Sequence, residues 1–126
     1  MAKAPIAIEK PVPEPETMSP QTNEEYLERG WLYFSKQKYE LAEADIQLVL
    51  QSDPHNVDAL YVLGLTLKAA GKSQQAMDAF TKIDEMISYV DDHQRAIIIS
   101  RLAHGQVNQI RSGNWDLEKE IWKSIH

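Results

Sequence analysis

The chain has 126 residues, of which 43% are hydrophobic and 25% are charged, and its formal net charge is −6. This length fits one domain with a core of modest size. The absence of cysteine excludes disulfides and thiolate metal sites, and the negative charge argues against nucleic acid or anionic lipid as a partner. No apolar run is long enough for a signal-peptide core or a membrane span, so we expect a soluble, cytoplasmic protein.

Proline is concentrated in the first twenty residues, which hold five of the six prolines in the chain. Proline removes a backbone donor and fixes φ, so this segment cannot be helical or lie inside a sheet. The composition predicts a disordered, extended arm over residues 1–22. A second interpretation is a strap that docks on the rest of the chain through Ile6, Ile8 and Val12.

From residue 23 onward the apolar residues recur with helical spacing, and no segment alternates with a period of two. Asn23, Ser73 and the pair Asp91 and Asp92 are predicted N-caps, and Gly71 is a predicted C-cap. The pattern predicts an all-α fold of six helices in three antiparallel pairs. These helices are expected at about 24–36, 39–51, 57–70, 73–89, 91–111 and 115–125.

The sequence matches itself when it is shifted by 34 residues. A small residue in the first helix of each pair faces a small residue in the second, which lets the two helices approach closely. Bulky residues beside them fill the space between helices and between repeats. The matched positions are Tyr26 with Leu60, Gly30 with Gly64, Tyr33 with Leu67, Ala42 with Ala76, and Ile46 with Phe80.

This pattern resembles the tetratricopeptide repeat (TPR), whose motif is roughly W-x2-L-G-x2-Y, then A-x3-F, then P. The resemblance implies a short right-handed solenoid of stacked antiparallel helix pairs. The motif positions hold Tyr26, Arg29, Gly30, Tyr33, Ala42, Ile46 and Pro54 in the first repeat, and Leu60, Leu63, Gly64, Leu67, Ala76, Phe80 and Ser88 in the second.

The third unit is degenerate, because its small residue is Gly105 rather than residue 98. We therefore expect a TPR domain over residues 23–126, with repeats at about 23–56, 57–90 and 91–126. The last helix, with Trp115 and Trp122 on one apolar face and charges on the other, is predicted to cap the open end of the solenoid.

Few residues suggest chemistry. The chain has no G-x-S-x-G motif, and the spacing of its four histidines is not that of metal ligands. We expect no enzyme activity, no metal and no cofactor. The scattered histidines leave a metal protein or an enzyme as a weakly supported alternative.

The resemblance implies that the first helix of each repeat lines a concave groove that binds a partner peptide or helix. The groove residues are then Leu27, Trp31 and Phe34 in the first repeat, Tyr61, Leu65 and Lys68 in the second, and Ala103, Val107 and Ile110 in the third.

Residues 23–54 carry a net charge of −4, which predicts an acid-rimmed groove and a basic or amphipathic partner. Some TPR domains hold a chaperone C-terminus with a clamp of lysine, asparagine and arginine. The corresponding positions here include Leu27, Trp31, Asp58 and Val62, so that clamp is absent.

The predicted function is therefore that of a non-catalytic scaffold or adaptor, a TPR module for protein–protein interaction. The alternative is a self-assembling structural protein whose repeat faces meet between chains. The sequence leaves open whether Trp31 and Phe34 receive a partner or are covered by the proline-rich arm or a neighbouring subunit.

Overall fold

The computed structural model describes residues 12–113, which form five α-helices and two short 3₁₀ turns and contain no strand. The prediction of an all-α fold is confirmed. The predicted sixth helix, with Trp115 and Trp122, lies outside the described residues. The helices are α1 (Asn23–Ser35), α2 (Tyr39–Ser52), α3 (Val57–Ala69), α4 (Ser73–Met86) and α5 (His93–Ser112), and the 3₁₀ turns are η2 (Pro15–Thr17) and η3 (Ile87–Tyr89).

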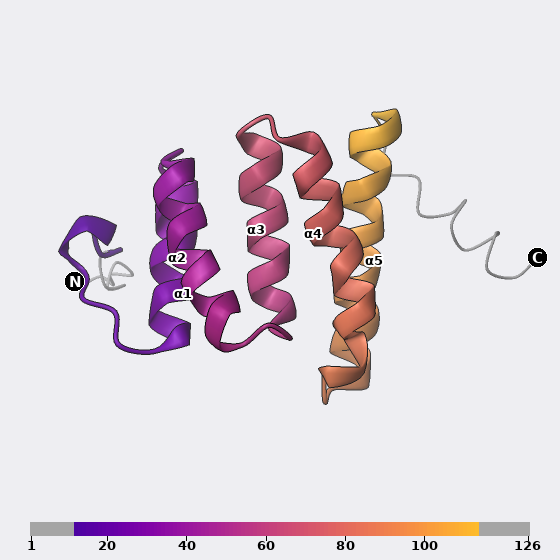
Figure 1. Ribbon diagram of the computed structural model, residues 1–126, viewed down its shortest axis with the longest axis horizontal. Coiled ribbons are helices and arrows are strands. Elements are labelled where there is room, and N and C mark those ends of the chain that lie inside the picture. Colours follow the sequence, from indigo (N-terminus) through magenta and orange to yellow (C-terminus); the bar gives the residue numbers. More distant parts are fainter. Residues whose placement is uncertain (1–11, 114–126) are drawn as a thin grey trace, which may run out of the picture.

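The helices pack as successive antiparallel pairs in a row. Helix α1 packs on α2 and α3 packs on α4, while α2 contacts α3 and α4 contacts α5 between neighbouring units. The arm and the first pair lie at one end of the long axis, and α4 and α5 lie at the other (Figure 1). Smaller contacts join α1 to α3 and α3 to α5. This is the stacking of a TPR solenoid, as the sequence predicted.

Two glycines set the distance between paired helices. A Cβ on Gly30 in α1 would lie 3.1 Å from Cγ1 of Ile46 in α2. A Cβ on Gly64 in α3 would lie only 2.5 Å from the ring carbons Cε1 and Cζ of Phe80 in α4. Both partners are fully buried. The spacing of 34 residues between these glycines therefore reflects the same close approach made twice.

Two predicted N-caps are wrong. Thr22 caps α1 in place of Asn23, because the Thr22 backbone is extended and its hydroxyl accepts a hydrogen bond from the Glu25 amide at 3.2 Å. Asn23 is already the first helical residue. Ser73 is likewise the first residue of α4, and Lys72 before it makes no side-chain cap.

The connection between α4 and α5 also differs from the prediction. Helix α4 ends at Met86, and Ile87–Tyr89 continue as the 3₁₀ turn η3, so the predicted helix to about residue 89 is too long by one turn. Asp92 caps α5 as predicted, because its side chain accepts a hydrogen bond from the Arg95 amide at 3.1 Å. The predicted C-cap Gly71 has a φ of +83°, a value that favours glycine.

The described part of the proline-rich arm, residues 12–22, is folded against α1. The prediction of a disordered arm is therefore wrong for these residues. Pro15 is fully buried, and the carbonyl of Met18 accepts a hydrogen bond from Nη1 of Arg29 at 3.5 Å. Val12, one of the three proposed anchors, is 72% exposed and does not hold the arm. The other two proposed anchors lie outside the described residues.

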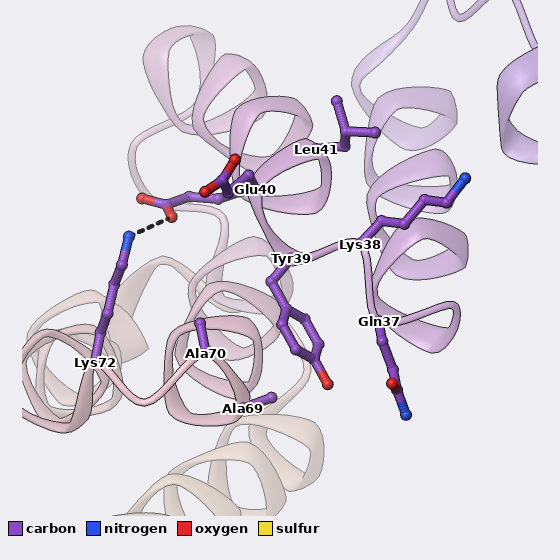
Figure 2. Close-up of a pocket in the computed structure, with 9 residues that line it drawn as sticks. Gln37, Lys38, Tyr39, Glu40, Leu41, Ala69, Ala70 and Lys72 are labelled. Carbon is purple, nitrogen blue, oxygen red and sulfur yellow. Dashed lines mark hydrogen bonds and ion pairs between the residues drawn. The ribbon is translucent and has the colours of Figure 1, made fainter.

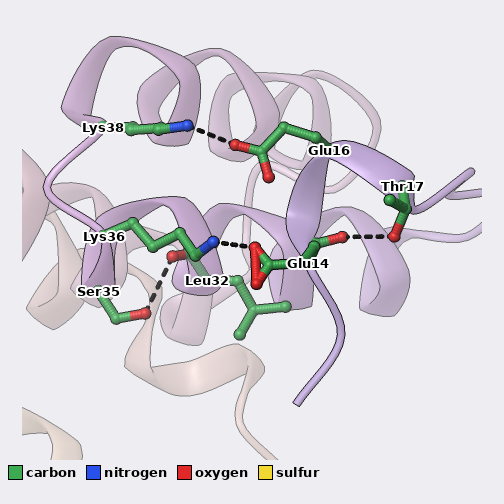
Figure 3. A network of polar contacts seen from close by, with 7 residues as sticks. All are labelled: Glu14, Glu16, Thr17, Leu32, Ser35, Lys36 and Lys38. Atoms are coloured by element: carbon green, nitrogen blue, oxygen red, sulfur yellow. Dashed lines mark hydrogen bonds and ion pairs between the residues drawn. The ribbon is translucent and has the colours of Figure 1, made fainter. Parts of the chain in front are cut away.

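Two ion pairs fix the arm at the turn between α1 and α2. Glu14 pairs with Lys36, and Glu16 pairs with Lys38 (Figure 3). The hydrogen bond from Lys38 lowers the pKa of Glu16, and the hydrogen bond to Glu14 raises the pKa of Lys36. Exposed pairs contribute little individually, but the prolines restrict the unfolded arm and reduce the entropy lost on docking.

A buried ion pair joins the first two helices on the side covered by the arm. Arg29 Nε and Nη2 donate to the two carboxylate oxygens of Asp45, each at 2.8 Å. The guanidinium carbon lies 5.6 Å from the Tyr26 ring centroid and 5.8 Å from that of Tyr33. Asp45 is only 3% exposed, and its hydrogen bonds raise the pKa of Arg29. This bidentate geometry is what allows a carboxylate to be buried in the core.

Candidate protein-binding surface

The six groove residues predicted from the sequence recur at i, i+4 and i+7 on α1 and α3, so each set of three follows one side of its helix. The two helices are in direct contact. Trp31 is 46% exposed, and the other five side chains are half-buried. We call the surface formed by these positions and their neighbours on α5 the α1–α3–α5 surface. It includes Leu27, Trp31, Phe34, Tyr61, Leu65 and Lys68.

Aromatic side chains form the α1 part of this surface. The ring centroids of Trp31 and Phe34 are 5.3 Å apart, and Phe34 lies 6.0 Å from Tyr39 at the start of α2. Residues 12–22 of the arm do not cover Trp31, because they dock on the side of α1 that carries Arg29. An exposed tryptophan supported by a second ring is typical of contact residues in protein interfaces.

Hydrogen bonds show which side of α5 continues the surface. Nζ of Lys68 donates to Oε1 of Gln106 at 2.7 Å and also to Oε1 of Gln109. Nε2 of Gln106 donates to the hydroxyl of Tyr61 at 3.0 Å. Leu102, one turn before Gln106, is 39% exposed. The third helix of the surface therefore contributes Leu102, Gln106 and Gln109.

The residues predicted for this third helix are wrong. Ala103 is fully buried in the core, and Val107 and Ile110 pack against that core. The error is one of register. Buried Gly105 is equivalent to Gly64 at a shift of 41, whereas the prediction used the shift of 42 given by the glycines at the helix ends. The small residue at the helix contact was the better guide.

The charges around the surface are unevenly distributed. Asp58 at the start of α3 is paired with Arg95 of α5. Lys68, near the opposite end of α3, has a pKa lowered by burial. Glu24 and Glu28 are exposed in the first part of α1.

A cavity of about 600 Å³ adjoins the surface between the α1–α2 turn and the α3–α4 turn. Tyr39 extends from the start of α2 toward Ala69 and Ala70 at the end of α3, and Lys72 contacts Glu43 at 3.4 Å (Figure 2). Tyr39 thus lies between this cavity and the aromatic side chains of α1.

The described residues offer little for catalysis. Asp84 of α4 accepts a hydrogen bond from Ser100 at 2.7 Å and also contacts His104 Nε2. Because His104 faces the carboxylate rather than the serine, this trio lacks the arrangement that activates a nucleophile. It links α4 to α5. Residues 12–113 contain no cluster of three or more histidine, aspartate or glutamate side chains placed to hold a metal ion.

None of the helices described between residues 12 and 113 has the length and apolar content needed to cross a bilayer.

Comparison with known proteins decides the family. The tetratricopeptide repeat family model matches residues 26–56 and 57–88, which together make up half of the chain. The chain belongs to the tetratricopeptide repeat family. The two matched segments correspond to the first two predicted repeats. TPR units generally mediate protein–protein interaction, and theirs is generally a non-catalytic fold. No curated protein and no solved structure matched the chain.

Proposed function

We propose that this protein is a non-catalytic binding module that holds a segment of a partner protein on its α1–α3–α5 surface. The observation that carries the proposal is the exposure of Trp31 beside Phe34 at the predicted groove positions of the first repeat. The half-buried Tyr61 and Leu65 extend the apolar area onto α3. An amphipathic helix or an extended peptide buries its apolar side chains against such a row.

The charge of the first repeat supports a partner with basic residues at one edge. Glu24, Glu25 and Glu28 are exposed along the first turns of α1. Lysine or arginine side chains of the partner gain from these carboxylates mainly in association rate and orientation. Apolar contact with Trp31 supplies most of the affinity.

A pull-down with a Trp31→Ala/Tyr61→Ala variant tests this function. Full-length wild type and variant, both shown by circular dichroism to be folded, are compared on a native lysate. The matched control is Leu41→Ala/Leu48→Ala, which removes two exposed leucines of α2 away from the proposed surface. We expect a protein that the wild type and the control retain and the variant loses. Equal retention by all three proteins contradicts the proposal.

Exposed leucines on α2 support self-assembly as a second candidate. Leu41 and Leu48 lie seven residues apart on one side of α2, as expected for a face that meets another chain. Light scattering over a wide range of protein concentrations decides between the two. A mass that rises with concentration in the wild type and not in Leu41→Ala/Leu48→Ala supports assembly, and a constant monomer mass rules it out.

A further inference from the structure

Lys68 differs from the paired lysines of this protein in the groups that balance its charge. Lys36, Lys38 and Lys72 each contact a glutamate. Within residues 12–113, Lys68 forms no ion pair with a carboxylate, and its ammonium donates to the amide oxygens of Gln106 and Gln109. Its side chain is half-buried between α3 and α5, and this burial lowers its pKa. The ammonium has therefore lost water without gaining an anion.

The polar atoms around Lys68 that remain available are donors. The amide oxygens of Gln106 and Gln109 already accept from the ammonium. The Tyr61 hydroxyl accepts from Gln106 Nε2, which leaves its own proton to be donated, and no acceptor for it lies among the described residues. The amide nitrogen of Gln109 is a further donor. An ammonium, a hydroxyl and an amide thus converge on the middle of the α1–α3–α5 surface.

We propose that Lys68, Tyr61 and Gln109 form a site for the side-chain carboxylate of an aspartate or glutamate in the bound partner. This inference rests on the proposed function and specifies the chemistry of the partner. A carboxylate supplies acceptors for these donors and an anion for Lys68. A phosphate group suits the site less well, because its near-double charge calls for arginine or a second lysine and the described neighbours of Lys68 are neutral amides.

The position of Lys68 on the middle helix indicates an internal residue of the partner. Apolar side chains flank the site on both sides, with Trp31 and Phe34 on α1 and Leu102 on α5. A segment that crosses all three helices places its apolar residues on α1 and α5 and the residue between them at Lys68. The expected ligand is therefore an apolar segment with one acidic residue near its centre, and a chain terminus is not required.

Selection from a phage-displayed library of random 12-residue peptides tests the inference on the full chain. We expect peptides whose binding is lost with Trp31→Ala and that carry aspartate or glutamate between apolar residues. A synthetic peptide of this kind should bind Lys68→Met about tenfold or more weakly than wild type, because a hydrogen-bonded ion is lost. Lys68→Arg should retain most of the affinity, and the matched control Lys82→Met, on exposed α4, should bind like wild type.

Changing the peptide identifies the interacting group. Replacing its acidic residue with the amide should weaken binding to wild type by a similar factor and cause no further loss with Lys68→Met. Amidation of the peptide C-terminus should change nothing, and a strong preference for a free C-terminus overturns the side-chain assignment. Peptides that depend on Trp31 but bind Lys68→Met as tightly as wild type also overturn the inference, while the proposed function stands. If no selected peptide depends on Trp31, the proposed function fails and this inference fails with it.

Discussion

Replacing Gly64 with alanine tests whether glycine sets the spacing of the second helix pair, and Gly30→Ala provides a matched comparison in the first pair. In both cases alanine removes the helix penalty of glycine, a gain of about 1 kcal/mol. At Gly30 the new methyl group meets Cγ1 of Ile46 at 3.1 Å, so a shift of a few tenths of an ångström relieves the contact. We expect the stability of Gly30→Ala to stay within about 0.5 kcal/mol of wild type.

Gly64→Ala should behave differently, because its methyl group would lie 2.5 Å from two ring carbons of Phe80. That ring is fully buried and lies 5.4 Å from Tyr61, so it has little room to move. Overpacking of this kind costs about 1–3 kcal/mol. Taking the upper value for so short a contact and subtracting the helix gain leaves a loss of about 2 kcal/mol, or roughly 8 °C in Tm for a domain of this size.

Thermal denaturation followed by circular dichroism measures both variants. Phe80→Leu is the control background, because it removes the ring carbons that the new methyl group meets. Gly64→Ala should be less destabilising in this background than in wild type, and the difference is the coupling energy of the pair. If Gly64→Ala and Gly30→Ala melt at the same temperature, the close approach of α3 and α4 is not what requires glycine.

Three further measurements test other parts of the structure. Asp45→Ala leaves the guanidinium of Arg29 without its carboxylate and should lower the free energy of unfolding by about 3 kcal/mol; adding Arg29→Leu should restore most of this loss, and a double variant as unstable as the single one in urea contradicts the reasoning. Trp31→Ala should lower that free energy by only about 1 kcal/mol, because the side chain is 46% exposed, and a loss as large as that of Asp45→Ala would place Trp31 in the core. The Lys38 hydrogen bond lowers the pKa of Glu16, so this pair stabilises the docked arm above pH 4.5, the usual pKa, and the contribution is lost as pH falls through the lower value of the folded state; NMR amide shifts of residues 14–18 that stay constant through this range contradict the ion pair.

The helix pairs were predictable because their signal is local and repeated. Gly30 and Ala42, like Gly64 and Ala76, mark where one helix crosses its partner, and a spacing of 34 residues leaves little choice of register. Helix ends were less predictable. Thr22 and Asn23 are both good N-caps, and backbone conformation rather than residue type decides between them.

The docked arm was not predictable from composition. Proline content describes which regular structures a segment cannot adopt, but docking depends on residues far away in sequence. Glu14 and Glu16 meet lysines that follow each of them by 22 residues, at a turn whose position only the folded chain defines. The third part of the binding surface failed for a related reason, because extra residues in α5 allowed two alignments that differ by one position.

The first repeat shows how the end of the solenoid is finished. In the second repeat, Leu63 and Ala79 line the space beside α2, where one repeat meets the next. The equivalent positions of the first repeat hold Arg29 and Asp45, which pair with each other beneath the arm. A face that meets another repeat is apolar, whereas the face that meets the arm carries a satisfied ion pair and a donor for the carbonyl of Met18. Residues 12–22 therefore belong to the folded unit, and covering this end of the row leaves the α1–α3–α5 surface, with Trp31 exposed, as the part of the described chain best suited to a partner.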